Sequence, residues 1–276
     1  MTIEITINNK KILTPPGKSV LEVANDNHIT IPTLCYHKDL STVGSCRLCV
    51  VEVEGWRGQV TACTLEAEHG MSVKTETPAV IQARREILKL LLQNYYDSHL
   101  ESEPDQNEFA AWLKYYQVKP DHTSMLEMRY EVNSDPNPFI WVDLNKCILC
   151  TRCVRACAEI QGRFVWNVGY RGFETKIIAG ADTDLISARC ESCGACVAYC
   201  PTGALDNKMS RNLRFPEKLV TTTCTYCGVG CQLDLNIKGN KIIEVTSNPN
   251  SPVNGMHLCV KGRYGYDFVH HEERVK

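Results

Sequence analysis

The sequence CILCTRCVRAC at 147–157 and the sequence CESCGACVAYCP at 190–201 decide the fold of this chain. Each contains four cysteines in the pattern C-x2-C-x2-C-x3-C, and Pro201 follows the second run. Three thiolates spaced by two residues can wrap one face of a cubane cluster, whereas the fourth, at the start of a helix, points away from it. The pattern therefore predicts two metal clusters that exchange their fourth ligand.

This spacing is similar to that of bacterial ferredoxins with two [4Fe–4S] clusters. We expect the first cluster to be bound by Cys147, Cys150, Cys153 and Cys200. We expect the second to be bound by Cys190, Cys193, Cys196 and Cys157. A pair of zinc sites is the alternative, because CxxC pairs often bind zinc. Zinc has no use for the crossed fourth cysteine, and this favours iron–sulfur clusters.

The bulk properties exclude several classes of protein. A formal net charge of −2 over 276 residues provides no basic surface for nucleic acid or membranes. The densest apolar stretch, at 87–92, is far too short to span a bilayer. The first seven residues alternate between polar and apolar and lack the features of a targeting peptide. We therefore expect a cytoplasmic protein without a membrane span or a nucleic-acid partner.

Cysteine is unusually frequent, with 16 residues. A secreted disulfide scaffold this rich in cysteine would be short and would carry a signal peptide. In a reducing compartment, clustered cysteines indicate metal binding instead. The 16 residues divide into four groups of four, so we interpret every cysteine as a metal ligand.

Residues 1–78 predict a small β-rich domain. Apolar residues alternate over 3–7, Asn8-Asn9 offers a turn, and a return strand follows. Ser19 and Glu22 form the sequence signature of a capping box for a helix over 20–25. The candidate ligands are Cys35, Cys46, Cys49 and Cys63. Gly44 and Ser45 make a small-residue loop that lets backbone N–H groups approach the sulfurs.

The segments TLCYH at 33–37 and GSCRLCVVEV at 44–53 resemble those of a known family. They resemble the N-terminal [2Fe–2S] domain shared by the large iron–sulfur subunit of respiratory complex I, the iron-only hydrogenases and the NAD-linked formate dehydrogenases. The resemblance implies a β-grasp fold with one [2Fe–2S] cluster. A structural zinc knuckle is the alternative for these four cysteines.

Residues 79–138 contain no cysteine and predict helices over 80–94 and 107–117. In the family, a sequence like RREILKLLLQN (84–94) leads into a site of one histidine and three cysteines. Here Tyr95 stands at the position of that histidine, and His99 alone cannot hold a cluster, so we interpret it as a surface histidine. We expect a helical domain that has lost its cluster and serves as a docking surface. The residues at 133–138 predict a linker.

Residues 139–210 hold the two ferredoxin-like runs, and their sequence resembles the same region of formate dehydrogenase and hydrogenase subunits. Lys146 directly precedes the first run, and Arg152 and Arg155 lie within it, so all three are near the first cluster. We interpret these charges as solvated, because charges beside exposed loops usually stay in water. Tuning of a cluster potential, or docking of a partner, is the alternative role.

Residues 211–276 contain a fourth set of candidate ligands, Cys224, Cys227, Cys231 and Cys259. TTCTYCGVGC at 222–231 and LCVKGRYGYDF at 258–268 resemble the [4Fe–4S] domain that begins molybdenum or tungsten bis-pterin oxidoreductases. In that family, the lysine that Lys261 resembles lies between the cluster and the pterin. The resemblance implies a cofactor-binding Lys261, with a surface lysine as the alternative. The segments 232–237 and 241–245 predict a hairpin.

We therefore expect an α+β chain of small iron–sulfur domains, at 1–78, 79–138, 139–210 and 211–276, with one [2Fe–2S] and three [4Fe–4S] clusters. We expect no catalytic residue, since the resemblance stops before the catalytic domain and no nucleotide motif is visible. The predicted function is electron relay between a flavin- and NAD(P)-binding partner and a catalytic formate dehydrogenase or bifurcating hydrogenase subunit. Ferredoxin is a further partner if electrons bifurcate. The alternatives are a zinc-binding scaffold and the N-terminal part of a longer formate dehydrogenase.

Overall fold

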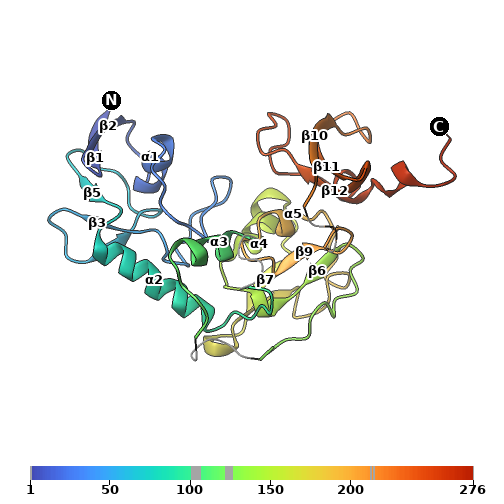
Figure 1. Ribbon diagram of the computed structural model, residues 1–276, viewed down its shortest axis with the longest axis horizontal. Helices are drawn as coiled ribbons and strands as arrows, with labels where there is room; N and C mark the ends of the chain where they lie inside the picture. Colours follow the sequence, from blue (N-terminus) through green and yellow to red (C-terminus); the bar gives the residue numbers. More distant parts are fainter. Residues whose placement is uncertain (1, 101–106, 122–126, 212, 214, 276) are drawn as a thin grey trace. The chain divides into compact units, whose positions relative to one another are not determined.

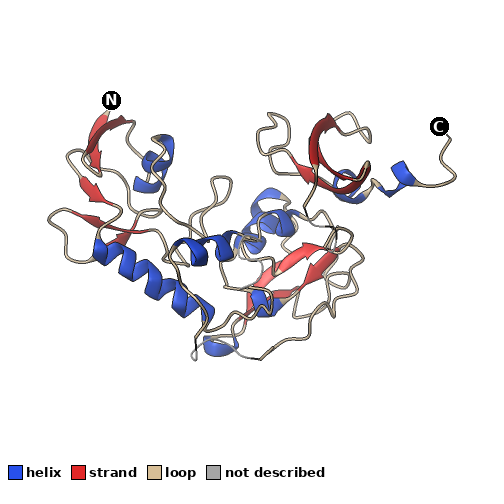
Figure 2. Ribbon diagram, viewed as in Figure 1, coloured by secondary structure: helices blue, strands red, loops and turns tan. Residues whose placement is uncertain are grey.

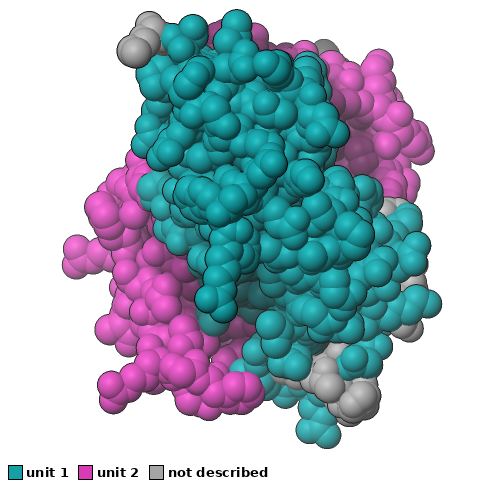
Figure 3. Space-filling view, turned by 90° about the vertical axis from the view of Figure 1, so that its left-hand side faces the viewer, with its two compact units in different colours: residues 1–129, 145–150 teal, residues 130–144, 151–276 magenta. Residues whose placement is uncertain are grey.

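The computed structural model describes residues 2–100, 107–121, 127–211, 213 and 215–275 (Figure 1). Parts of the predicted domains 79–138 and 211–276 lie outside these residues. The chain divides into two compact units, residues 1–129 with 145–150 and residues 130–144 with 151–276, which Figure 3 colours separately. Both units mix helices with small sheets, so the fold class is α+β (Figure 2).

The first unit begins with a β-rich part. Its elements are β1 (Ile3–Ile7), β2 (Lys10–Thr14), α1 (Val20–Asp26), β3 (Val50–Val53), β4 (Gln59–Thr61) and β5 (Ser72–Lys74). The strands form one sheet in the order β2-β1-β5-β3-β4, in which β1 and β5 are parallel. Asn8 and Asn9 both have positive φ, as a two-residue hairpin turn requires. Ser19 and Glu22 form the predicted capping box at the start of α1.

Two helices, α2 (Pro78–Leu92) and α3 (Glu108–Tyr115), complete the first unit. Thr77 caps α2, and Asn107 caps α3. Arg84 of α2 is fully buried and donates to the carbonyl oxygen of Val50 at 2.9 Å, which ties the helix to β3. The apolar faces of both helices build a core of their own beside the sheet core. Both helices fall where the sequence predicts them.

The ferredoxin-like part of the second unit is made of short elements. They are β6 (Ile140–Val142), α4 (Arg152–Arg155), a π-helical turn η2 (Ala156–Ile160), β7 (Trp166–Gly169), η3 (Gly172–Glu174), β8 (Lys176–Ala179), α5 (Ala195–Ala198) and β9 (Leu205–Asn207). A short 3-10 helix η1 (Leu144–Lys146) precedes the first cysteine run. Strand β6 pairs with β9, β7 pairs with β8, and α4 packs against α5.

The segment predicted as a linker is packed into this part of the fold. Asn137 is 1% exposed, accepts hydrogen bonds from the backbone N–H groups of Phe139 and Ile140, and donates to Ser192 Oγ. Asp135 accepts from the backbone N–H of Leu185. The linker prediction is wrong for these residues, because the Asp and Asn side chains satisfy backbone donors that would otherwise be buried without partners.

The C-terminal part contains β10 (Lys218–Thr223), β11 (Gln232–Lys238), β12 (Lys241–Ser247), α6 (Val260–Tyr264) and η4 (Asp267–His270). The strands form an antiparallel sheet, and α6 packs on β12. Gly239 and Asn240, both at positive φ, turn the predicted hairpin between β11 and β12. Among the described residues, none of the helices has the length and apolar character needed to cross a bilayer.

Candidate metal centres

The four cysteines of the N-terminal set converge inside the first unit. All four are at least 94% buried. Cys49 directly precedes β3 and Cys63 follows β4, and the pairing of Val50 with Thr61 holds these two thiols together. The thiol of Cys49 hydrogen-bonds to that of Cys63, and the thiol of Cys35 hydrogen-bonds to that of Cys46. The structure therefore brings the predicted ligands together as two pairs.

In each pair, the hydrogen bond between the two thiols lowers the pKa of one and raises the pKa of the other. The hydrogen bond from Cys46 lowers the pKa of Cys35 to about 5, against the opposing effect of burial. The same bond, together with burial, raises the pKa of Cys46. The hydrogen bond from Cys63 likewise lowers the pKa of Cys49, while that of Cys63 is raised. In each pair, one thiol therefore loses its proton more readily than the other. The thiolate is the form that binds metal.

The loop before Cys46 supplies the donors that the sequence predicts there. The side-chain and backbone groups of Ser45 and the backbone N–H of Cys46 hydrogen-bond to the sulfur of Cys35. Donors around a ligand sulfur are what an iron–sulfur site requires of its surroundings. Gly44 has φ +62, and a Cβ on it would lie 3.1 Å from the methyl group of Thr64. The residues present therefore fit a cluster at this site.

The two pairs face different cores of the first unit. Cys49 and Cys63 belong to the core of the sheet and α1. Cys35 and Cys46 belong to the core built by α2 and α3, which also contains Cys150. Tyr95, which the sequence predicts to replace a histidine ligand, is 2% exposed and lies edge-on to Phe109 in this core. His99 is exposed, as predicted. The cysteine-free helices therefore share a core with the Cys35–Cys46 pair, and their predicted docking role stays a prediction.

A second set converges in the second unit. Burial raises the pKa of Cys196 well above its usual range, and the charges of Cys193, Cys190 and Cys157 raise it further. These four sulfurs are thus close enough to interact, and they are the predicted crossed set. Their loop presents N–H groups, with Ser192 donating to Cys190 Sγ at 3.3 Å. The structure brings Cys157 to the second run, as the exchange of ligands requires.

The first run repeats the backbone of the second. Leu149 and Thr151 have φ of +55 and +59, and the equivalent Ser192 and Gly194 have φ of +54 and +72. Positive φ is costly for a β-branched residue such as Thr151, and such strain is characteristic of functional loops. Of the predicted first-cluster ligands, Cys147 and Cys150 belong to the first unit, and Cys153 and Cys200 belong to the second. This set therefore stays a prediction from the sequence.

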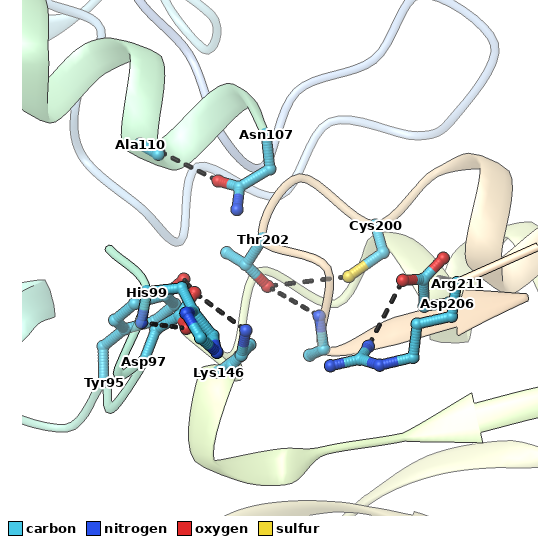
Figure 4. Close-up of polar contacts among 11 residues, drawn as sticks. Tyr95, Asp97, His99, Asn107, Ala110, Lys146, Cys200, Thr202, Asp206 and Arg211 are labelled. Atoms are coloured by element: carbon cyan, nitrogen blue, oxygen red, sulfur yellow. Dashed lines mark hydrogen bonds and ion pairs between the residues drawn. The ribbon is translucent and has the colours of Figure 1, made fainter. Parts of the chain in front are cut away.

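The three charged residues at the first run are buried. Lys146 is 7% exposed, Arg152 is 2% exposed and Arg155 is 6% exposed. The prediction that they are solvated is therefore wrong. For Lys146 the reason is an ion pair with Asp97, a residue of the helical region whose proximity no local pattern indicates (Figure 4).

A further set converges in the C-terminal part. The N–H of Cys224 donates to the carbonyl oxygen of Cys231 at 2.8 Å. Burial raises the pKa of Cys231, and the charges of Cys224, Cys227 and Cys259 add to the effect. Cys227 and Cys259 are exposed, in contrast to the N-terminal set. Lys261, two residues after Cys259, is also exposed, and its cofactor role stays a prediction.

Within the described ranges, no three His, Cys, Asp or Glu side chains lie close enough to hold a single metal ion.

Comparison with protein families assigns three parts of the chain to iron–sulfur domains. Residues 1–78 match the 2Fe-2S iron-sulfur cluster binding domain. Residues 137–206 match the ferredoxin-like domain of NADH-quinone oxidoreductase subunit 3, and residues 217–271 match the molybdopterin oxidoreductase Fe4S4 domain. The chain is therefore an iron–sulfur protein built from small domains of the [2Fe–2S] and [4Fe–4S] types, which confirms the predicted fold class.

The relatives of the whole chain are subunits of redox enzymes. It is 34% identical over 280 residues to a NADH-quinone oxidoreductase subunit of Rhizobium meliloti (strain 1021), covering 99% of this chain and 32% of the relative. It is 34% identical over 281 residues to the NADPH-Fe(3+) oxidoreductase subunit alpha of Geobacter sulfurreducens (strain DL-1 / KN400), with the same coverage. The chain thus spans about a third of the length of these relatives.

A solved structure gives the same assignment. The crystal structure of a NAD+-reducing [NiFe]-hydrogenase in its H2-reduced state matches with a TM-score of 0.67 and 27% identity, over 78% of this chain and 92% of that chain. The chain is therefore similar to subunits of NADH- and NADPH-linked oxidoreductases and to a chain of an NAD+-reducing hydrogenase, which confirms the predicted resemblance.

Proposed function

We propose that the chain is an electron-transfer subunit that holds one [2Fe–2S] and three [4Fe–4S] clusters. The observation that carries the proposal is the convergence of three four-cysteine sets in the fold. A fourth set has the spacing of the same ferredoxin pattern. When bound, the clusters supply one-electron transfer, and the cysteine thiolates together with the loop N–H groups hold them and set their potentials.

We further propose that electrons pass between a flavin- and NAD(P)-binding partner and a separate catalytic site. The NADH- and NADPH-linked names of the relatives support the first partner. The exposure of Cys227 and Cys259 supports an electron exit at the C-terminal set, because an uncovered cluster can come close to an outside acceptor. Lys261, which is also exposed, is the proposed contact to a cofactor of that acceptor. Clustered thiol ligands suit a reducing compartment, which supports a cytoplasmic location.

The identity of the catalytic partner has two candidates. The match of residues 217–271 to a molybdopterin oxidoreductase domain favours a pterin enzyme such as formate dehydrogenase. The structural likeness to a [NiFe]-hydrogenase favours a hydrogenase. The two candidates are distinguished by isolating the complex anaerobically and measuring whether it reduces NAD with formate or with hydrogen. Ferredoxin-dependent turnover in the same assay tests electron bifurcation.

Metal analysis with EPR spectroscopy tests the proposal itself. We expect about 14 irons per chain, broad visible absorbance that dithionite bleaches, and EPR signals of both cluster types in the reduced protein. Four zinc ions in a colourless protein would instead establish a structural scaffold.

A further inference from the structure

Helix α6 lies against two of the cysteine sets in the second unit. It starts directly after Cys259, a predicted ligand of the C-terminal set. A Cβ placed on Gly262 would lie 3.9 Å from Cys224 Sγ, so this side of the helix faces that set. The next residue, Arg263, reaches the loop of the Cys190–Cys196 run.

The contact of Arg263 with this loop is buried. Arg263 is 2% exposed, and its Nε donates to the carbonyl oxygen of Cys193 at 3.0 Å. Burial raises the pKa of the Cys193 thiol, and the positive charge of Arg263 opposes that effect. A guanidinium remains charged in proteins, so a full positive charge lies inside the second unit beside the crossed cysteine set.

The loop is shaped to receive this side chain. Gly194 follows Cys193 and has φ +72. A Cβ at Gly194 would lie 2.4 Å from Arg263 Cδ and 2.5 Å from Tyr264 Oη, so only glycine leaves the space that α6 occupies. Tyr264 fixes the helix further, since its hydroxyl lies 2.6 Å from Asn207 Oδ1 and its ring stacks on Phe139.

One nitrogen of Arg263, Nη2, is buried and has no hydrogen-bond partner among the described residues. Burying a guanidinium nitrogen without a hydrogen-bond partner costs free energy, unless a negatively charged group lies beside it. The thiolates and sulfides of a [4Fe–4S] cluster would provide that negative charge and the missing acceptors.

We propose that Arg263 is a positioning residue that orients and electrostatically tunes the cluster held by Cys157, Cys190, Cys193 and Cys196. Its charge and its donors stabilise the reduced state of this cluster and so raise the potential. Because Arg263 extends from the helix that follows Cys259, it also fixes this cluster relative to the C-terminal one. The inference rests on the proposed function, since it requires iron at the crossed set.

The test compares Arg263→Met and Arg263→Lys with the wild-type protein, using iron content and EPR-monitored redox titration of each cluster. We expect Arg263→Met to keep its iron and to change the reduced-to-oxidised ratio of one [4Fe–4S] cluster at least tenfold at fixed potential. That change corresponds to a midpoint potential lower by 59 mV for a one-electron couple. The [2Fe–2S] midpoint stays unchanged. Arg263→Lys, which keeps the charge, restores most of the shift.

Arg189→Met is the matched control, because Arg189 is an exposed arginine directly before Cys190. Water screens its charge, so we expect less than a twofold change in that ratio.

If Arg263→Met or Arg263→Lys cannot be isolated with iron, Arg263→Gln, which keeps donors without the charge, carries the same test. Unshifted midpoints in an iron-replete variant overturn the inference, as does an equal shift in Arg189→Met. Absence of iron in the wild type would instead overturn the proposed function.

Discussion

Lys146 Nζ lies 2.8 Å from Asp97 Oδ2, and the two side chains are 9% and 1% exposed. Asp97 follows Tyr95 by two residues, in the region where the family pattern places a metal site, and Lys146 precedes Cys147. Asp97 also accepts a hydrogen bond from the backbone N–H of His99 (Figure 4). The ion pair therefore joins the cysteine-free helical region to the start of the first cysteine run within one compact unit.

Asp97→Asn should destabilise the protein strongly. The substitution leaves the ammonium of Lys146 buried without its counter-charge, and breaking a buried pair in this way typically costs about 3–5 kcal/mol. Unfolding under anaerobic conditions, followed by circular dichroism, measures the loss. Glu4→Gln is the control, because Glu4 pairs with Lys11 at the surface, and such pairs contribute about 0–1 kcal/mol. Equal stability of the two variants would contradict the importance of the buried pair.

Tyr116→Phe should destabilise the packing of α2 against the C-terminal end of α3. The hydroxyl of Tyr116 lies 2.9 Å from Arg84 Nη1, and Arg84 is fully buried. Removal of one partner of a buried hydrogen bond costs about 1–3 kcal/mol. Tyr115→Phe is a matched control, because Tyr115 is adjacent and 64% exposed, and it should change the free energy of unfolding by less than about 0.5 kcal/mol.

The hydrogen-bonded pair of Tyr116 and Arg84 also predicts that the stability of the protein depends on pH. Burial raises the pKa of Tyr116 above its ordinary value of 10.0, although Arg84 opposes the shift. The neutral hydroxyl therefore contributes stability that is complete below about pH 10 and is lost as the pH rises through the higher folded-state pKa. Tyr116→Phe cannot titrate, so the stability difference from wild type should narrow above about pH 10. A difference that stays constant to higher pH would contradict a raised pKa.

The sequence predicts the local features of this fold and misses those that depend on distant partners. Cysteine spacing, the Ser19 capping box and the Asn8-Asn9 turn are local patterns with local causes. The hydrogen bond from Arg263 to Cys193 joins residues 70 positions apart, and no periodicity or motif indicates it. The burial of Lys146 escapes prediction for the same reason, since side-chain composition around a loop does not show whether another segment covers it.

Asn137→Ala tests the structural role of the segment predicted as a linker. The side chain accepts hydrogen bonds from the backbone N–H groups of Phe139 and Ile140 and donates to Ser192, which lies between two predicted cluster ligands. Leaving these buried donors without an acceptor costs about 1–3 kcal/mol each. We expect reduced stability and faster loss of iron to a chelator. Asn167→Ala, at an exposed asparagine with hydrogen bonds no shorter than 3.5 Å, should behave as wild type. Wild-type stability and iron retention in Asn137→Ala would show that these hydrogen bonds do not support the second cysteine run.

Gly194→Ala tests the space between the second cysteine run and α6. Any non-glycine residue at its positive φ costs about 1–2 kcal/mol in backbone strain. Gly203→Ala measures the backbone strain alone, because Gly203 has φ +70 and no atom lies within 4 Å of the added Cβ. Gly194→Ala carries an additional overpacking cost of about 1–3 kcal/mol, since the methyl group meets Arg263 and Tyr264. We therefore expect Gly194→Ala to lose stability and iron from one [4Fe–4S] cluster, while Gly203→Ala loses only the smaller amount. Equal losses in the two variants would show that the conformation of the loop, and not the packing of α6 against it, determines the glycine.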